Sequence, residues 1–199
     1  VWKWISGFVR GDFGRSFEHR LPVSEMLWAR LGFTILISTL TLVFSWTVAI
    51  AVGVYSATHR YTIPDYVITV LQFVGLSVPN FLLALVLMVF AQQVLGMDVG
   101  GLYSTAYRNA PFSLGKFIDL LKHLWIPIIV IGASGTAWLS RVMRGNMLDV
   151  LNMQYVQTAR AKGLPENRVI WKHAVRNALH PLVMVLGMSL PMIISGETV

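Results

Sequence analysis

The sequence predicts an all-α protein whose helices cross a membrane several times. Of its 199 residues, 55% are hydrophobic and 13% are charged, whereas soluble domains contain about 45–50% apolar and about 25% charged residues. Four stretches also lack Asp, Glu, Lys and Arg over lengths close to the roughly 20 residues that a helix needs to cross a bilayer. Because backbone groups inside lipid must be hydrogen-bonded within the segment, these stretches are expected to be helices.

Each of the four stretches is long enough for a membrane helix, either by itself or together with residues that flank it. The first two exceed the required length, and the third reaches it when it is extended past Arg141, whose long side chain can reach the membrane surface. The fourth qualifies despite Pro181 and Pro191. We therefore expect a transmembrane domain over 31–199, preceded by a separate segment over 1–30. The expected helices span residues 31–58, 66–97, 124–143 and 177–199, with a loop over 144–176.

Charge and cysteine content exclude other classes of protein. The formal net charge of +7 would suit a nucleic-acid-binding protein. The basic residues flank the apolar stretches and form no single patch, so no nucleic-acid partner is expected. The lack of Cys excludes a disulfide framework, a cysteine-based zinc site and thiol catalysis. Lys and Arg divide equally between the two sides of a four-helix topology, so the positive-inside rule does not orient the chain by itself.

Polar residues inside the predicted helices have two interpretations. Polar groups in a membrane bundle bind water or another helix, and small residues let helices approach closely. One interpretation is ordinary packing of helices that are kinked at proline. The other is the wall of a solute pathway, for which five residues are candidates: Gln72, Ser77, Asn80, Ser134 and Thr136.

The segment 141–181 is too polar to cross the membrane, and its pattern predicts two short helices separated by a glycine. The apolar residues within 155–159 share one face of the first helix. Gly163 is suited to end that helix in a left-handed conformation, and Pro165 is suited to start the second helix. The segment could bind lipid headgroups through its basic residues, or it could dock onto a cytoplasmic partner.

A short motif within this segment is similar to a known family. The sequence QTARAKG, from Gln157 to Gly163, resembles the EAA loop of binding-protein-dependent ABC importer permeases. The sequences HAVRNALHP, over 173–181, and RGDFGRS, over 10–16, are similar to the dipeptide, oligopeptide and nickel branch of that family. Two features depart from the broad EAA pattern: Gln157 replaces the leading acid, and residues 173–176 replace the usual apolar-x-Leu-Pro. The peptide branch shares both departures.

The resemblance implies a polytopic permease of the MetI-like type, usually with six membrane helices, of which this chain would hold four as a fragment. It places the 144–176 loop in the cytoplasm, so that residues 1–30 and 98–123 are extracytoplasmic. The implied location is the inner or plasma membrane of a prokaryote. The residues that would couple to an ATPase are Tyr155, Gln157, Thr158, Ala159, Arg160, Ala161, Lys162 and Gly163.

By the same resemblance, the chain is expected to translocate a peptide-like or related small solute. The implied partners are a second permease subunit, paralogous or identical, two ATP-binding subunits, an extracytoplasmic solute-binding protein and the lipid bilayer. No cofactor is expected on this chain, since ATP and Mg²⁺ would bind the partner subunits.

Motifs for catalysis are missing from the sequence, which suits a chain that is not an enzyme. It contains no G-x-x-x-x-G-K-[ST] phosphate loop, no H-E-x-x-H and no G-x-S-x-G. Its five histidines lack metal-ligand spacing, so neither catalytic nor metal-binding residues are predicted. The alternative function is a secondary transporter or channel subunit that is not coupled to an ATPase. It would need an ion-coupling acid inside an apolar stretch, and the four stretches contain none. An intramembrane enzyme, the third class, would need a catalytic pair at membrane depth.

Overall fold

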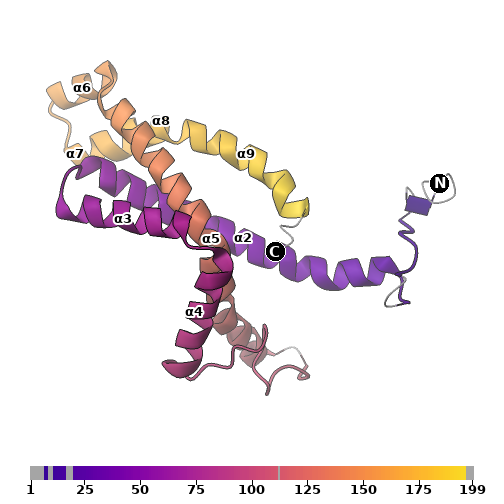
Figure 1. Ribbon diagram of the computed structural model, residues 1–199. Helices are drawn as coiled ribbons and strands as arrows, with labels where there is room; N and C mark the ends of the chain where they lie inside the picture. The colour runs from indigo at the N-terminus through magenta and orange to yellow at the C-terminus, as the bar shows by residue number, and fades with distance from the viewer. Residues whose placement is uncertain (1–6, 9–10, 17–19, 112, 196–199) are drawn as a thin grey trace.

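The computed structural model describes residues 7–8, 11–16, 20–111 and 113–195, and these residues form mainly helices (Figure 1). One isolated antiparallel bridge, between Arg15 and Pro22, is the β contact within this part of the chain. The predicted all-α class is confirmed. The helices are, in chain order, α2 (Val23–Thr58), α3 (Ile63–Ser77), α4 (Asn80–Gln93), α5 (Leu114–Leu151), α6 (Gln154–Ala161), α7 (Glu166–Arg168), the π-helix η1 (Val169–Val175), α8 (Arg176–Ala178) and α9 (His180–Ser195).

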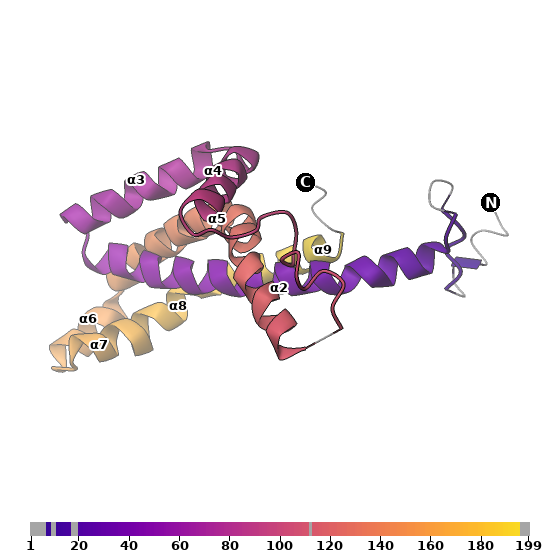
Figure 2. The ribbon, with the colours of Figure 1, turned by 90° about the horizontal axis from the view of Figure 1, so that it is seen from below.

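Helix α5 is the centre of the arrangement. It makes its most extensive contact with α2, and α3, α4, α8 and α9 also pack against it. Seen from below, α3 and α4 lie on one side of α2, and α6 to α8 lie on the other (Figure 2). Every other part of the bundle is therefore positioned relative to α5.

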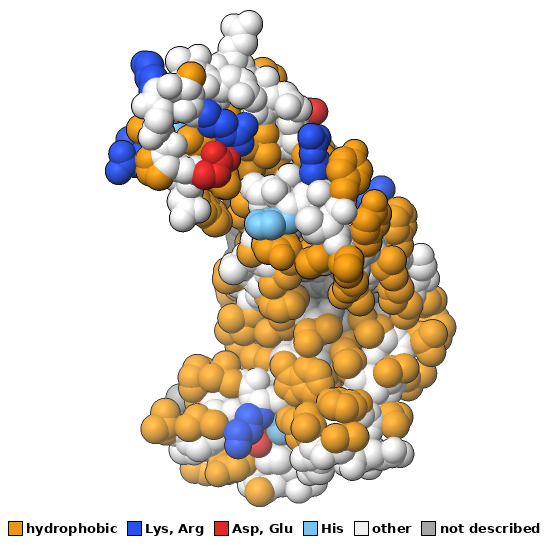
Figure 3. Space-filling view, turned by 90° about the vertical axis from the view of Figure 1, so that its left-hand side faces the viewer, with side chains coloured by type: hydrophobic (Ala, Val, Ile, Leu, Met, Phe, Trp, Pro, Cys, Tyr) orange, Lys and Arg blue, Asp and Glu red, His pale blue; other side chains and the backbone are white. Residues whose placement is uncertain are grey.

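Side chains of different types occupy different levels of the molecule (Figure 3). On the face shown there, Lys, Arg and acidic side chains gather at the end formed by α6 and α7, and hydrophobic side chains cover the middle. Among the described residues, α2 and α5 are each long and apolar enough to cross a membrane, and the bent pair of α3 and α4 would add a third span. Helix α9 is described only as far as Ser195, so the crossing expected over 177–199, and with it the total of four, stays a prediction.

The expected helix over 66–97 is broken in its middle. The chain bends by 108° between α3 and α4, across Val78 and Pro79. Pro79 has no N–H for a helical hydrogen bond and takes an extended conformation, with φ −60° and ψ 138°. The residue before a proline is also driven out of the helical region, and Val78 has ψ 123°. The break therefore follows from one proline.

Helix α5 is longer than the sequence pattern suggests. It runs from Leu114 to Leu151 rather than over 124–143, so it includes the first eight residues of the expected 144–176 loop. It starts where the Ser113 hydroxyl accepts a hydrogen bond from the Lys116 backbone N–H at 3.2 Å, a typical N-cap. At 1.5 Å per residue, the helix is about 57 Å long. One continuous helix thus joins the segment after residue 98 to the charged end of the molecule.

The crossing of α2 and α5 depends on two glycines. A Cβ on Gly53 would lie 2.6 Å from the Cβ of Met143 and 2.8 Å from the carbonyl oxygen of Ser140. A Cβ on Gly132 would lie 2.9 Å from the Oγ of Ser45, whose hydroxyl donates a hydrogen bond to the Gly132 carbonyl at 3.3 Å. Small residues therefore bring the two helices close enough for backbone and side chains to touch.

An ion pair with a buried carboxylate connects the helices of the same bundle at its charged end. The Asp65 side chain is 3% exposed and lies 2.9 Å from Nη2 of Arg144, whose Nε is 3.2 Å from the other carboxylate oxygen. The Ser56 hydroxyl donates to the same carboxylate and accepts a hydrogen bond from the Arg144 Nε at 2.9 Å. The Tyr61 backbone N–H, in a residue with φ +63°, also donates to Asp65 at 2.9 Å. These hydrogen bonds join α5 to the end of α2, to the turn after α2 and to the start of α3.

The close crossing predicts that a single methyl group at Gly53 destabilises the bundle. In Gly53→Ala the new Cβ meets the Ser140 backbone, which cannot rotate away, so we expect the overpacking to cost about 1–3 kcal/mol. The measurement is thermal unfolding of the full-length protein in lipid nanodiscs, followed by tryptophan fluorescence. Gly145→Ala, where a Cβ meets nothing within 4 Å, is the matched control. Equal unfolding temperatures for the two variants would contradict this account.

Candidate functional site

The charged end of the molecule is a helical hairpin, residues 154–178, which follows directly after α5. Its first leg is α6, and its second leg is the continuous run of α7, η1 and α8. Between the legs Gly163 has φ +73°, its N–H donates to the Arg160 carbonyl at 2.9 Å, and the Leu164 N–H donates to the Ala159 carbonyl at 3.4 Å. These two bonds satisfy the free carbonyls at the end of α6 in a Schellman motif. The predicted short helix and the glycine stop are confirmed.

The inner face of the hairpin is a small apolar core. Val156 and Ala159 of α6 and Val169 of η1 are buried together, with Leu164 partly buried against them. Ala159 therefore packs against the second leg and is not part of the exposed surface. Tyr155 is exposed, and its hydroxyl accepts a hydrogen bond from the Asn177 side chain at 2.9 Å. The first leg is thus fixed to the second at both of its ends.

The outer face of α6 carries the remaining predicted coupling residues. Gln157, Thr158, Ala161 and Lys162 are all exposed. The Gln157 side chain donates to the Leu151 carbonyl at 3.1 Å, and the Thr158 hydroxyl donates back to α6 at 2.9 Å. The side chains of Gln157 and Thr158 are therefore held by hydrogen bonds to the end of α5 and to α6 itself, which leaves a small exposed surface in a fixed position.

Arg160 does not belong to that free surface. Its guanidinium donates to both carboxylate oxygens of Glu166, at 2.7 Å and 3.2 Å, across the Gly163 turn. The hydrogen bond from Arg160 lowers the pKa of Glu166, and the same bond raises the pKa of Arg160. An ion pair this exposed contributes about 0–1 kcal/mol to stability. Its main effect is to neutralise Arg160, so Lys162, which directly follows α6, is the unpaired cation among the predicted coupling residues that the structure describes.

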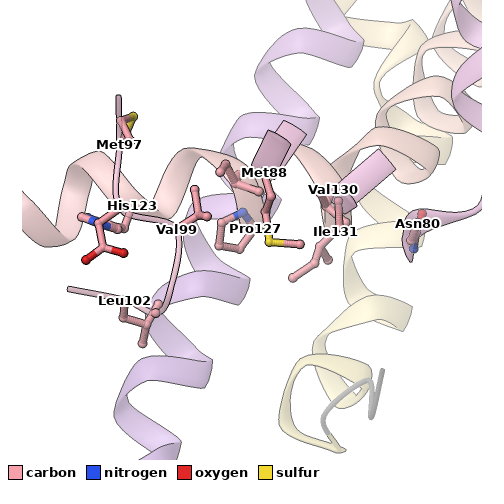
Figure 4. Close-up of a pocket in the computed structure, with 13 residues that line it drawn as sticks. Asn80, Met88, Met97, Val99, Leu102, His123, Pro127, Val130 and Ile131 are labelled. Carbon is pink, nitrogen blue, oxygen red and sulfur yellow. The ribbon is translucent and has the colours of Figure 1, made fainter. Parts of the chain in front are cut away.

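The five candidate pathway residues do not form one lining. Gln72 is buried between α3 and α5, where its side chain donates to the Ser140 hydroxyl at 2.9 Å. Ser77 is exposed at the end of α3, and Ser134 and Thr136 are half-buried in α5. Asn80 lines a cavity of about 470 Å³ between α4 and α5 (Figure 4). The other four are absent from the lining of this cavity.

The network around Asp65 is a feature that sequence reasoning missed. Asp65 follows Pro64 at the start of a helix, and a carboxylate is common in the first turn of a helix because it interacts favourably with the helix dipole. Its partner Arg144 is 79 positions away, and no local pattern connects the two. The available signal is that an acid and an arginine border two separate apolar stretches on the same predicted side of the membrane.

Comparison with known proteins places the chain in a family. The family described as "Binding-protein-dependent transport system inner membrane component" matches residues 49–199. The chain is 40% identical over 198 residues to the oligopeptide transport system permease protein AppB of Bacillus subtilis, which covers 99% of this chain and 61% of that protein. It is 31% identical over 198 residues to the glutathione transport system permease protein GsiC of Salmonella typhimurium, which covers 100% of this chain and 60% of that protein.

The chain therefore spans about three fifths of the length of these relatives. The match to the family contains the whole 154–178 hairpin, in which the QTARAKG motif forms most of α6 and its glycine stop. The resemblance that this motif suggests is confirmed at the level of the family. The chain belongs to the inner membrane components of binding-protein-dependent transport systems.

Proposed function

We propose that the chain is the permease subunit of an ATP-driven importer, which moves a peptide-like solute delivered by an extracytoplasmic binding protein. The observation that carries the proposal is α6, an eight-residue helix held on a hairpin with its outer face exposed at the charged end. Two relatives are named for oligopeptide and glutathione transport, which supports a solute with peptide bonds. Two ATP-binding subunits and a second permease subunit complete the proposed assembly.

In this mechanism the chain converts a movement of its partners into a movement of its helices. An ATP-binding subunit that closes around ATP would displace α6, which it holds in a groove. Only Asn152 and Met153 separate α6 from α5, so a displacement of α6 passes directly into a helix about 57 Å long. The second leg passes the same displacement to α9 through η1 and α8. The first leg therefore moves α5 and the second leg moves α9. As these helices move, the solute pathway alternates between outward and inward access.

The lipid-binding interpretation of the hairpin predicts a different contact. Exposed Lys162, Arg168, Lys172 and Arg176 could each bind a headgroup phosphate. Thr158 and Ala161 on the exposed part of α6 are too small to anchor the hairpin in the membrane, and the exposed large apolar side chains nearby are Tyr155 on the same helix and Trp171 on the second leg. A protein groove suits this small polar face better than a bilayer does.

Docking is tested by crosslinking. The chain has no native cysteine, so single cysteines placed at Thr158 and Ala161 are unique probes. We expect both to form disulfides with cysteines in the groove of the cognate ATP-binding subunit, because both side chains are exposed on the outer face of α6. A cysteine at Ala106, exposed in the segment between α4 and α5, should form none. Crosslinking from Ala106 alone would mean that the predicted orientation in the membrane is wrong. Crosslinking from none of the three positions would favour the interpretation in which the hairpin binds lipid headgroups.

The turn at Gly163 predicts a second effect on transport. A β-branched residue in the left-handed conformation costs about 1–2 kcal/mol, which shifts a conformational population about 5- to 30-fold. We expect Gly163→Val to lower ATP-driven peptide uptake into proteoliposomes by a factor in that range while membrane insertion is unchanged. Gly163→Asn is the control, because Asn tolerates the left-handed region. Uptake by Gly163→Val that equals uptake by Gly163→Asn would contradict the role of the turn.

A further inference from the structure

We propose that the second leg of the hairpin binds the headgroups of anionic phospholipids at the membrane surface. The binding groups are Arg168, Lys172 and Arg176, which we call the basic row, together with the neighbouring Trp171. This inference goes beyond the proposed function, which gives α6 a protein partner and leaves the second leg without one. The two legs of the hairpin then contact different partners.

The second leg has one buried face and one basic face. Its buried side chains are Val169, Ala174, Val175 and Ala178. The three residues of the basic row are exposed, and each follows the one before by four positions. Four positions are close to one full turn both in an α-helix and in the wider π-helix, so the row lies along one side of the leg. The buried side chains face the bundle and α6, and the row faces away from them.

The basic row has no acidic partner within the described part of the chain. The segment 141–181 contains two acids, Asp149 and Glu166. Glu166 is paired with Arg160, and Asp149 forms no ion pair with any described residue. Like charges four positions apart on a helix repel each other. A partner that brings negative charge from outside the chain would therefore stabilise the row.

Contacts with α5 place the second leg at the expected boundary of the membrane. The Asn146 side chain donates to the Ala178 carbonyl at 3.3 Å, and Arg144, two residues earlier in α5, binds Ser56 near the end of α2. Ala178 therefore lies at the level where the uncharged stretch 31–58 ends. One cavity of about 420 Å³ also touches both segments, and its lining includes Ala57, Thr58, Asn167 and Ile170. In Figure 1, α7 and α8 accordingly lie next to the end of α2 that precedes α3.

The second leg continues without a break into α9, the expected fourth crossing. The Leu179 N–H donates to the Val175 carbonyl, and the Val183 N–H donates to the Leu179 carbonyl, both at 3.0 Å. Arg176 is six residues before Leu182, which is about 9 Å along the axis. A bilayer of about 40–45 Å with a core of about 30 Å has headgroup layers of about 5–8 Å on each side. Because long basic side chains can extend along a helix toward this layer, the basic row can reach it.

Exposed aromatic side chains gather at the same level. Trp171, beside the basic row, is 58% exposed, and Tyr55 and Tyr66 are exposed at the end of α2 and the start of α3. Trp and Tyr are enriched where a membrane meets water, because one part of the ring system is apolar and another part is polar. A basic face with an exposed Trp is typical of a helix that lies at a lipid surface.

An acidic surface of the ATP-binding subunit is the main competing partner. It could pair with the three cations, but it would not account for an exposed Trp171 at the level where α2 leaves the membrane. Headgroup phosphates at that level can accept hydrogen bonds from Arg and Lys while the Trp171 ring enters the boundary of the acyl chains. Anionic lipids are favoured over zwitterionic lipids, because only the former carry net negative charge to neutralise the row.

The test is photolabelling of the full-length permease in its assembled complex, in nanodiscs of phosphatidylcholine. The probe is phosphatidylglycerol with a diazirine near the glycerol end of one acyl chain. Phosphatidylcholine with the same diazirine is the neutral probe of matched shape. We expect the anionic probe to label residues 167–178 at least about fivefold more strongly than the neutral probe, the effect of one cation near a charged surface.

Variants of single lysines separate charge from folding. Lys172→Gln should lower labelling by the anionic probe about fivefold, whereas Lys172→Arg keeps the charge and should retain the labelling. Lys162→Gln removes an equally exposed lysine of the same hairpin outside the row, and it should leave the labelling of 167–178 unchanged. Replacing all three residues of the row with Gln should abolish the preference for the anionic probe. The Lys172 pair stays informative where the triple variant fails to assemble.

Three results would overturn the lipid site: equal labelling of 167–178 by the two probes, equal labelling of Lys172→Gln and Lys172→Arg, and an absence of label from 167–178. Loss of the ATP-binding subunit from Lys172→Gln, without a preference for the anionic probe, would instead assign the row to that subunit. Crosslinking from a cysteine at Thr158 is measured in parallel. A normal crosslink without anionic labelling rejects the lipid site and leaves the proposed function standing. Anionic labelling without the crosslink supports the lipid site and rejects the docking of α6.

Discussion

The fold depends on one ion pair, between the buried carboxylate of Asp65 at the start of α3 and the partly exposed Arg144 near the end of α5. Losing Arg144 would leave the buried carboxylate uncompensated, and about 3–5 kcal/mol is the upper range of that cost, which applies to fully buried pairs. Here the pair also organises neutral groups, because Ser56 and the backbone of Tyr61 direct their hydrogen bonds to the same carboxylate. The left-handed turn between α2 and α3 is held by that carboxylate, and α5 cannot slide past the turn without breaking the three hydrogen bonds that Arg144 donates to Ser56 and Asp65.

In the proposed mechanism, the hairpin acts on helices that this ion pair holds rigidly together. Arg144 lies two turns before the end of α5, and the hairpin begins three residues after that end. The hairpin is itself closed by the apolar core around Val156, by the Arg160–Glu166 pair and by the Tyr155–Asn177 hydrogen bond. In the proposed mechanism, a displacement of α6 therefore reaches α5 through the two residues between them, and it reaches α2 and α3 through the ion pair. The Gly53 crossing adds close packing at the same level of the bundle, since Met143 contacts that glycine.

Sequence reasoning succeeds where the signal is local and fails where it is distant. Uncharged stretches predict the helical class, and the motif that ends in Gly163 predicts the hairpin, because helix length and glycine stops depend on neighbouring residues. The full extent of α5 is missed because Lys122 and Arg144 are interpreted as membrane boundaries, although a helix can continue past them into water. The Asp65–Arg144 and Gln72–Ser140 contacts are missed because each joins segments more than 60 positions apart. Ala159 and Arg160 are placed correctly in α6, but only the tertiary structure shows that the first is buried and the second neutralised.

The central claim is that the ion pair carries the movement of the hairpin into the bundle. The most direct measurement is the ratio of peptide taken up to ATP hydrolysed by the assembled transporter in proteoliposomes. Asp65→Asn keeps an acceptor for the turn but loses the charge that holds Arg144. The account predicts that this variant assembles and hydrolyses ATP at close to the normal rate while its uptake per ATP falls, and that Asp65→Arg combined with Arg144→Asp recovers part of the ratio. An assembled Asp65→Asn transporter with a normal ratio of uptake to hydrolysis would contradict it.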